Sequence, residues 1–257
     1  MGSIFNSLSS LFKKKEKKDS DFEKFNNIME FADKVLRDNK YALIDLIKSL
    51  MFSVQYDEIK DVIVNGQHQR DFNFLCDFFW DDDKYIWTSM RFKKINVKPK
   101  ESDKNFKLDL KKDIVISSPW DRDRLSSAFS GYGDGKNKKS WRQDNNHNVE
   151  TWLPWGISIV NSGNHSIAAG IISGDGYLSP CIIYDFNSIF DIVKCDGKKY
   201  IYTGPETINE NTMKYIKPND IIAAIDNVNT ACVFEIGRMM SENGVCAWPD
   251  VNFVNAN

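Results

Sequence analysis

The sequence predicts an α+β protein, with an N-terminal helical region followed by a domain built on a mixed β-sheet. Apolar residues between 20 and 54 recur at the spacing of amphipathic helices. Short stretches between 85 and 116 alternate apolar and polar residues, as half-buried strands do. A β-branched strand, a tight polar turn and an apolar helix then follow one another between residues 156 and 172. The 257 residues suffice for one large domain with a helical extension.

The first 19 residues are expected to form a basic amphipathic tail. Lys13 to Lys18 is a basic run, and the apolar residues before it stand at helical spacing: Ile4, Phe5, Leu8, Leu11 and Phe12. Such a helix can lie peripherally on an anionic membrane surface. The alternative is an N-terminal helix that frays or is covered by a partner, with a solvated run of charge.

The helical region is assigned to residues 20–80 and the α/β domain to residues 81–257. Ser20-x-x-Glu23 has the form of a capping box, which predicts that a helix begins there. A second helix is expected from Tyr41 to Val54, because its apolar residues recur every three or four positions.

Several elements are expected around the centre of the α/β domain. Glycine, asparagine and basic residues predict a mobile loop from Ser130 to Asn148. Asp196-Gly197 predicts a type I′ hairpin turn, and Asn219 or Asp220 is expected to cap a partly helical segment, residues 221–240. Asp81-Asp82-Asp83 favours a solvated loop, with a divalent-cation site as the alternative. Strands are expected at residues 85–92, 95–97, 106–110 and 114–116.

The centre of the α/β domain is a predicted βαβ core within residues 113–186. Gly156–Val160 is expected to be a buried strand, Ser166–Ile172 a helix capped by Ser166, and Cys181–Tyr184 a second strand that ends at Asp185. The turn Gly163-Asn164-His165-Ser166 then stands at a helix N-terminus. Unpaired backbone N–H groups and the positive end of the helix dipole suit an anion such as phosphate at such a turn.

Several side chains near this turn are candidates for function. His165 could bind phosphate or act as a general acid or base, and the alternative is a helix cap in which it contacts a backbone carbonyl. Arg122 and Arg124 could reach a phosphate, although local Asp–Arg pairing is also possible. Asp185 could hold a metal or act as a base near the same sheet edge, and otherwise it is an exposed turn aspartate.

The segment Ile157–Gly170 resembles the strand–turn–helix of the ParB/sulfiredoxin-like superfamily, whose turn commonly reads Gly-x-His-Arg. Gly163 and His165 match, whereas Ser166 stands where the arginine is usual. The resemblance covers roughly residues 113–186. It implies that the turn, including Asn164, binds nucleotide phosphates. The sequence does not identify a cofactor, and a nucleotide with Mg²⁺ is possible. Members include a CTP-binding partition protein, an ATP-using sulfinic-acid reductase and a free-serine kinase.

Other chemistries find little support in the sequence. It lacks a P-loop, a G-x-S-x-G motif and paired cysteines, and its three histidines have no zinc-site spacing, so no metal site is predicted. Five scattered cysteines favour reduced thiols and a cytoplasmic protein. The net charge of -2 neither favours nor excludes nucleic acid. Two functions remain: a phosphate- or nucleotide-binding protein with possible phosphoryl transfer or hydrolysis, or a non-catalytic module that binds a protein partner.

Overall fold

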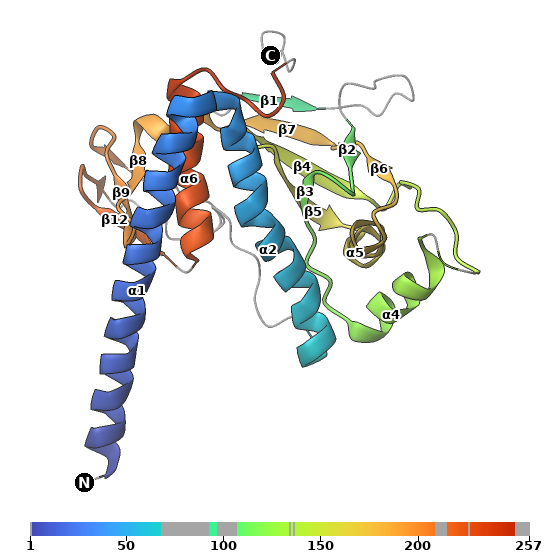
Figure 1. The fold of residues 1–257 in the computed structure, drawn as a ribbon, viewed down its shortest axis with the longest axis horizontal. Coiled ribbons are helices and arrows are strands. Elements are labelled where there is room, and N and C mark those ends of the chain that lie inside the picture. The colour runs from blue at the N-terminus through green and yellow to red at the C-terminus, as the bar shows by residue number, and fades with distance from the viewer. Residues whose placement is uncertain are drawn as a thin grey trace.

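The computed structural model describes residues 2–67, 93–96, 107–133, 135, 137–208, 215–225 and 227–249. The predicted α+β class is confirmed: an N-terminal helical region is followed by several sheets with mixed strand orientation (Figure 1). The predicted helical residues 68–80, the strand at 85–92 and Asp81-Asp82-Asp83 lie outside the described residues. Among those described, no helix has both the length and the apolar character needed to cross a membrane.

Two long helices make up the N-terminal region. α1 (Gly2–Asn39) and α2 (Leu43–Asn65) are joined by the short 3-10 helix η1 (Lys40–Ala42). The capping-box prediction was wrong, because Ser20 lies inside α1 and the helix continues through it. The second helix was predicted correctly but runs eleven residues further than expected. It buries Leu43, Ile47 and Met51, which share one face because they recur every four residues.

A five-stranded sheet forms the centre of the molecule, in the order β1-β7-β4-β5-β3. Strand β3 lies at one edge and is buried on both faces, which explains its unbroken apolar sequence. Helix α2 covers this edge, and Gln55 Oε1 accepts a hydrogen bond of 2.8 Å from the backbone N–H of Val115. The strands are β1 (Lys93–Asn96), β3 (Ile114–Ile116), β4 (Asn148–Leu153), β5 (Ile157–Ser162) and β7 (Ile182–Asp185).

The strand orientations correct the predicted βαβ core. Helix α5 (Asn164–Ser173) follows β5 as expected, and β7 comes after it. However, β4 lies between β5 and β7, pairing antiparallel with the first and parallel with the second. The strands β5 and β7 therefore run in opposite directions. The parallel neighbour of β5 is instead β3.

Helices cover both faces of this sheet (Figure 1). On one face, side chains of β3, β4 and β5 share a core with α1, α2 and α6 (Val228–Glu242). On the other face, Val115, Val149 and Val160 pack against α5 and against Leu125 of α4 (Arg122–Gly131). Because successive strand residues point to opposite faces, one sheet contributes to both cores.

Smaller sheets flank the central one. β8 (Val193–Cys195) and β9 (Lys199–Tyr202) form the expected hairpin, but the turn is shifted by one residue, with Gly197 at the first central position. Of the two central residues, Gly197 and Lys198, only Gly197 has positive φ, so the turn is type II′ rather than I′. Other elements are η3 (Asn187–Asp191) and the paired strands β2 (Leu108–Asp109) with β6 (Tyr177–Leu178) and β10 (Thr207–Ile208) with β11 (Tyr215–Ile216).

The predicted helical segment from residue 221 to 240 contains a strand and a helix. Its first residues form β12 (Ile221–Ala224), which pairs antiparallel with β9. Helix α6 begins only after Asn227, whose side chain accepts from the Asn229 N–H. The cap is therefore Asn227 rather than Asn219 or Asp220, because the strand's pairing with β9 outweighs its local helical pattern.

Candidate functional site

Two helices begin at the end of the central sheet where strands β3 and β5 finish. Strands β3 and β5 are parallel neighbours, so their carboxyl ends reach the same edge. β3 continues through Ser117–Trp120 into α4, and β5 continues through Gly163 into α5. Helices α4 and α5 contact each other. Each helix N-terminus carries partial positive charge, and this end of parallel strands is a common place for ligands.

Gly163 forms the turn between β5 and α5. It is the N-cap of the helix, with a left-handed backbone and φ of 84°. A Cβ at this position would overlap the ring of His147 and lie 3.2 Å from the backbone oxygen of Asn146. Both the dihedral angle and the lack of space therefore require glycine. The prediction that Ser166 is the N-cap was wrong, because the helix already begins at Asn164.

Asn164 ties this helix to the end of β3. Its side chain is buried, and its Oδ1 accepts a hydrogen bond of 2.8 Å from the backbone N–H of Ser118. The Ser117 hydroxyl lies 2.7 Å from the backbone oxygen of Asn164 and 3.1 Å from its Oδ1. Ser118 in turn donates to Glu58 on α2. The side-chain oxygen of Asn164 thus has a structural role, because it joins the start of α5 to the end of β3.

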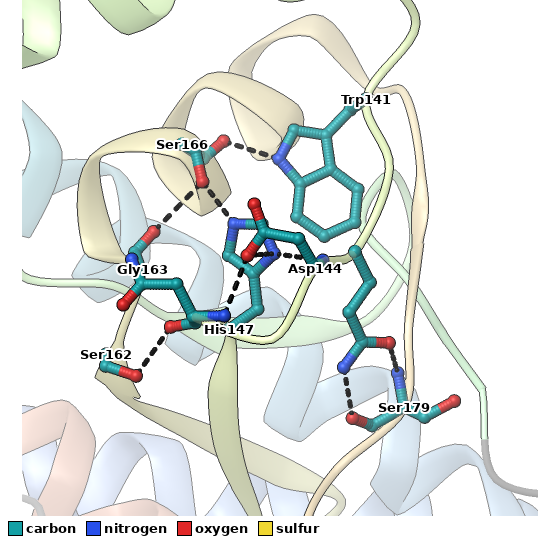
Figure 2. A network of polar contacts seen from close by, with 9 residues as sticks. Trp141, Asp144, His147, Ser162, Gly163, Ser166 and Ser179 are labelled. Carbon is teal, nitrogen blue, oxygen red and sulfur yellow. Dashed lines mark hydrogen bonds and ion pairs between the residues drawn. The ribbon is translucent and has the colours of Figure 1, made fainter.

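Ser166 is held by His147, which comes from the segment before β4 (Figure 2). The backbone N–H of Asp144 donates to His147 Nδ1 at 2.8 Å. Nδ1 is therefore the unprotonated nitrogen of a neutral ring, and Nε2–H donates to the Ser166 hydroxyl in a short hydrogen bond. The hydroxyl then donates to the backbone oxygen of Gly163 at 3.3 Å. Burial lowers the pKa of His147, against an opposing effect of the Asp144 carboxylate, so the neutral form is favoured.

Asp144, His147 and Ser166 are the residue types of a catalytic triad, but their hydrogen bonds have the wrong direction. Asp144 Oδ1 lies 3.2 Å from His147 Nδ1. In a triad, Nδ1 donates to the carboxylate and Nε2 accepts the serine proton. Here Nδ1 accepts a backbone N–H and Nε2 is a donor, so the ring cannot take the proton of Ser166. The arrangement stabilises the turn instead of activating a nucleophile.

His165 faces the start of α4. Its Nε2 accepts a hydrogen bond of 3.2 Å from the backbone N–H of Asp121, so the proton of the neutral ring is on Nδ1. The ring meets Trp120 edge to face, with 4.3 Å between centroids. Burial lowers the pKa of His165, Arg124 lowers it further, and Asp121 opposes both. A backbone hydrogen bond with Asp121 also partly offsets the lowering of this pKa. His165 is therefore a half-buried neutral donor.

The two arginines of α4 have different surroundings. Arg124 is exposed, and its guanidinium lies over the Trp120 ring at 5.5 Å from the centroid. It is close enough to His165 to lower the pKa of that ring. Arg122 instead donates to the backbone oxygen of Ile63 at the end of α2. The structure therefore brings Arg124 near the predicted turn, while Arg122 holds α4 against α2. The predicted phosphate contact of Arg122 is not supported by this geometry.

Asp185 lies far from the predicted turn, which corrects its assignment to the same sheet edge. Along β4, Asn148 pairs with Ser162, whereas Leu153 pairs with Asp185. Asn148 and Leu153 are five residues apart along β4, which corresponds to about 16 Å of strand at roughly 3.3 Å per residue. The reason is the orientation of β7, which runs antiparallel to β5. Asp185 Oδ1 accepts from both the backbone and side-chain nitrogens of Asn187, so it forms a local turn.

Backbone donors remain at the start of α5. Gly163 has no side chain to cap the helix, and the N–H groups of Asn164, His165 and Ser166 have no acceptor among the described residues. The start of α4 differs, because Asp121 Oδ1 accepts from the N–H of Arg124. The carboxylate of Asp121 caps α4, so of the two N-termini the one of α5 is suited to an external anion.

Sequence analysis did not identify the residues that cover this turn and hydrogen-bond to it. His147 and Trp141 belong to the predicted mobile loop, yet both are buried. Trp141 donates through its indole N–H to the backbone oxygen of Ser166 at 2.7 Å (Figure 2). Gln143 exchanges two hydrogen bonds with the backbone of Ser179. The signal for anchoring was a tryptophan in a polar segment, since aromatic side chains usually seek burial. No sequence spacing indicated a His147–Ser166 contact.

Across the described ranges, no group of three or more His, Cys, Asp or Glu side chains is placed to hold a metal ion. The buried thiols are also inert in character. Burial raises the pKa of both Cys195 and Cys232 to about 12, so neither is a thiolate near neutral pH.

The fold and the site define an α+β protein in which an uncapped helix N-terminus stands at the edge of a mixed sheet, beside the start of a second helix. The chain belongs to a family of unknown function, DUF6710, whose model matches residues 10–246. This range includes α2, the central sheet and the whole turn. Comparisons with the curated proteins and with the solved structures gave no match.

Proposed function

We propose that the protein binds a phosphate-bearing anion, with nucleotides as the first candidates, at the N-terminus of α5. The observation that carries this proposal is the set of donors without acceptors. Three backbone N–H groups at residues 164–166 lack acceptors among the described residues, and His165 adds a neutral ring donor. The exposed guanidinium of Arg124 lies over Trp120 and acts electrostatically on His165. Phosphate offers several acceptor oxygens and negative charge, which suit such a set.

Nucleotides are favoured over free phosphate by the side chain of Trp120. It is 51% exposed and stands beside both His165 and Arg124. An exposed indole beside a phosphate site offers a face on which a base can stack. Glu58 accepts from Ser118, Asp121 caps α4, and Asp123 lies in the first turn of α4, so carboxylates near this end of the sheet oppose a bare anion. Mg²⁺ bound to the nucleotide would reduce this repulsion. The resemblance of the turn to the ParB/sulfiredoxin-like superfamily supports the same ligand class.

The proposed activity is binding, and it leaves the chemical step unassigned. His165 Nε2 is occupied by the Asp121 N–H and Nδ1 carries the proton, so the neutral ring is a donor and not a base. Asp185 lies at the opposite end of the strands. Phosphoryl transfer or hydrolysis would therefore need a general base from another part of the chain or from a partner.

A thermal-shift screen tests the proposal. The four nucleoside triphosphates and inorganic phosphate are compared with and without Mg²⁺. A ligand at 100 times its dissociation constant stabilises the folded protein by about 2.7 kcal/mol. Arg124→Gln should reduce the shift, and the exposed Arg37→Gln on α1 is the matched control, because it removes the same charge far from the site. The proposal fails if no ligand shifts the melting temperature, or if both variants respond like the parent.

The second candidate is a module that binds a protein partner. It is favoured by exposed apolar side chains around the junction of α2 and α4: Ile63, Val64 and Trp120. Arg122 and a bridge between Gln67 and Asp121 hold this junction together. Trp120→Ala would then abolish partner binding, whereas Arg124→Gln would leave it unchanged. The nucleotide proposal expects the reverse order, because the guanidinium contacts phosphate and the indole only supports the base.

A further inference from the structure

We propose that residues 4–18 of α1 bind the surface of membranes that contain anionic lipids. This proposal is independent of the ligand site on α5. Helix α1 is continuous from Gly2 to Asn39, so the basic tail and the first packed helix form one element. From residue 20 onward, where the structure describes the side chains of α1, the buried residues are Phe25 and Ala32, and these join the core shared with α2 and α6. Figure 1 shows the first turns of α1 extending away from the rest of the described chain.

The sequence of this extension places its apolar residues on one face. Ile4, Leu8 and Leu11 stand four and three residues apart, with Phe5 and Phe12 alongside. Since residues three and four apart are neighbours on a helix, these five share a stripe. The remaining positions of this stretch are polar: Asn6, Ser7, Ser9 and Ser10. The stripe is about two and a half turns long, which is enough to lie in an interface but not to cross a bilayer.

Charge favours an anionic membrane as the occupant. Lys13 to Lys18 contains five lysines and a single glutamate, whereas the whole chain has a net charge of -2. Lysines beside an amphipathic stripe lie at the level of the lipid headgroups, where anionic lipids attract them. The basic run directly follows the apolar stripe, so both can contact the same surface.

The same lysines argue against a second copy of the chain as the occupant. Lys15 follows Leu8 by seven residues, and Lys18 follows Leu11 by seven. A coiled coil would need apolar residues at these heptad positions and would extend over three or four heptads. On a membrane, lysine side chains can extend from the same face toward the headgroups. The pattern therefore fits a lipid interface better than a helical dimer.

Vesicle co-sedimentation of the full chain tests this proposal. Vesicles of phosphatidylcholine alone are compared with vesicles that also contain phosphatidylserine. Binding is expected only with phosphatidylserine. A variant with Lys13, Lys14 and Lys15 changed to Gln should bind on the order of 100-fold more weakly, from the loss of three surface lysines. Leu8→Asp with Leu11→Asp should also abolish binding. The control changes the same number of exposed lysines elsewhere to Gln: Lys34, Lys111 and Lys194.

Melting temperature and solution mass complete the test. All variants should melt like the parent without vesicles, because the extension is proposed not to pack on the body. The proposal would be overturned if the chain bound neutral vesicles as tightly as anionic ones. It would also be overturned if the control variant lost as much affinity as the variant at Lys13, Lys14 and Lys15. A lower melting temperature for Leu8→Asp with Leu11→Asp would show that the stripe packs within the protein. A dimer by light scattering that this variant dissociates would show that a second copy covers it.

Discussion

Two histidines lie at the first turn of α5, and their surroundings differ. On the side of His147 the turn is covered by other parts of the protein, which we call the closed side. On the side of His165 it carries donors that can reach a ligand, which we call the open side. His147 is buried, and both ring nitrogens have partners within the protein. His165 is half-buried, and the one hydrogen bond with a defined distance that its ring accepts comes from the Asp121 N–H. The closed side fixes the backbone of the turn, so the donors of the open side are already oriented for a ligand.

The comparison also separates two causes of a lowered pKa. Burial is the largest cause for both rings. At His147 the nearby Asp144 carboxylate opposes it, whereas at His165 the Arg124 guanidinium adds to it. Positive charge near a histidine disfavours its protonated form. The same positive charge favours an anionic ligand, so the lowered pKa of His165 agrees with an anion site.

Gly163→Ala should have the largest effect on stability and would break the closed side. Positive φ costs about 1–2 kcal/mol for alanine, and the overlap with His147 adds overpacking of about 1–3 kcal/mol. We expect the free energy of unfolding in urea to fall by about 2–5 kcal/mol in total. Gly244→Ala is the control, because it has φ of 63° but open space around its Cβ position. Equal losses in the two variants would contradict the close contact with His147.

His147→Ala and His165→Ala should sharpen the comparison. The first removes a buried ring and two hydrogen bonds, and should lower the free energy of unfolding by about 2–3 kcal/mol. The second removes one hydrogen bond from a half-buried ring and should cost about 0.5–1 kcal/mol. The rise in melting temperature caused by a nucleotide should be reduced more by His165→Ala than by His147→Ala, because His165 faces the proposed ligand. A larger stability loss for His165→Ala would mean that the open side is structural.

Acid should destabilise the protein through these histidines. Each ring has a pKa below 6.5 when folded and near 6.5 when unfolded. The unfolded state therefore binds more protons below pH 6.5, so the stabilising contribution is complete above that value and is lost as the pH falls through the folded pKa. The slope is at most about 1.4 kcal/mol per pH unit for each ring. This slope is measured by urea unfolding between about pH 7 and about pH 5, a range that includes the ordinary pKa of histidine.

His147→Gln is the variant that tests this pH dependence. Glutamine has no titrating ring, so the curve should become flatter in that range, and a further flattening should follow when His165 is also replaced. A parent protein that becomes more stable as the pH falls from 7 to 5 would contradict the lowered pKa values.

Asp185→Asn should have the smallest effect on ligand binding. The side chain lies at the other end of the strands and accepts hydrogen bonds only from Asn187 in the contacts described. Asparagine retains an acceptor oxygen, so we expect an unchanged nucleotide shift and a stability change within about 0.5 kcal/mol. A tenfold loss of nucleotide affinity would show that Asp185 reaches the site by a route that the strand pairing does not indicate.

The sequence alone determined the local elements of the site. The alternating β-branched residues before Gly163 predicted a strand, and the structure has β5 there. The glycine and asparagine predicted a tight turn, and the apolar residues after it predicted α5. These features depend on steric limits and on periodicity within a few residues, which the sequence contains directly. The start of the helix was misplaced by two residues because a serine pattern resembled a cap.

Only the tertiary structure decided which segments meet. Strand order placed Asp185 at the opposite end from His165, and no local pattern distinguishes a parallel from an antiparallel neighbour in buried strands. The contact of His147 with Ser166 joins residues that are nineteen apart in sequence. Such contacts follow from how the sheet twists and which helices cover it, and many side chains could satisfy the same packing. The chain therefore encodes the turn locally, whereas the surroundings that make it a site are set by the assembled core.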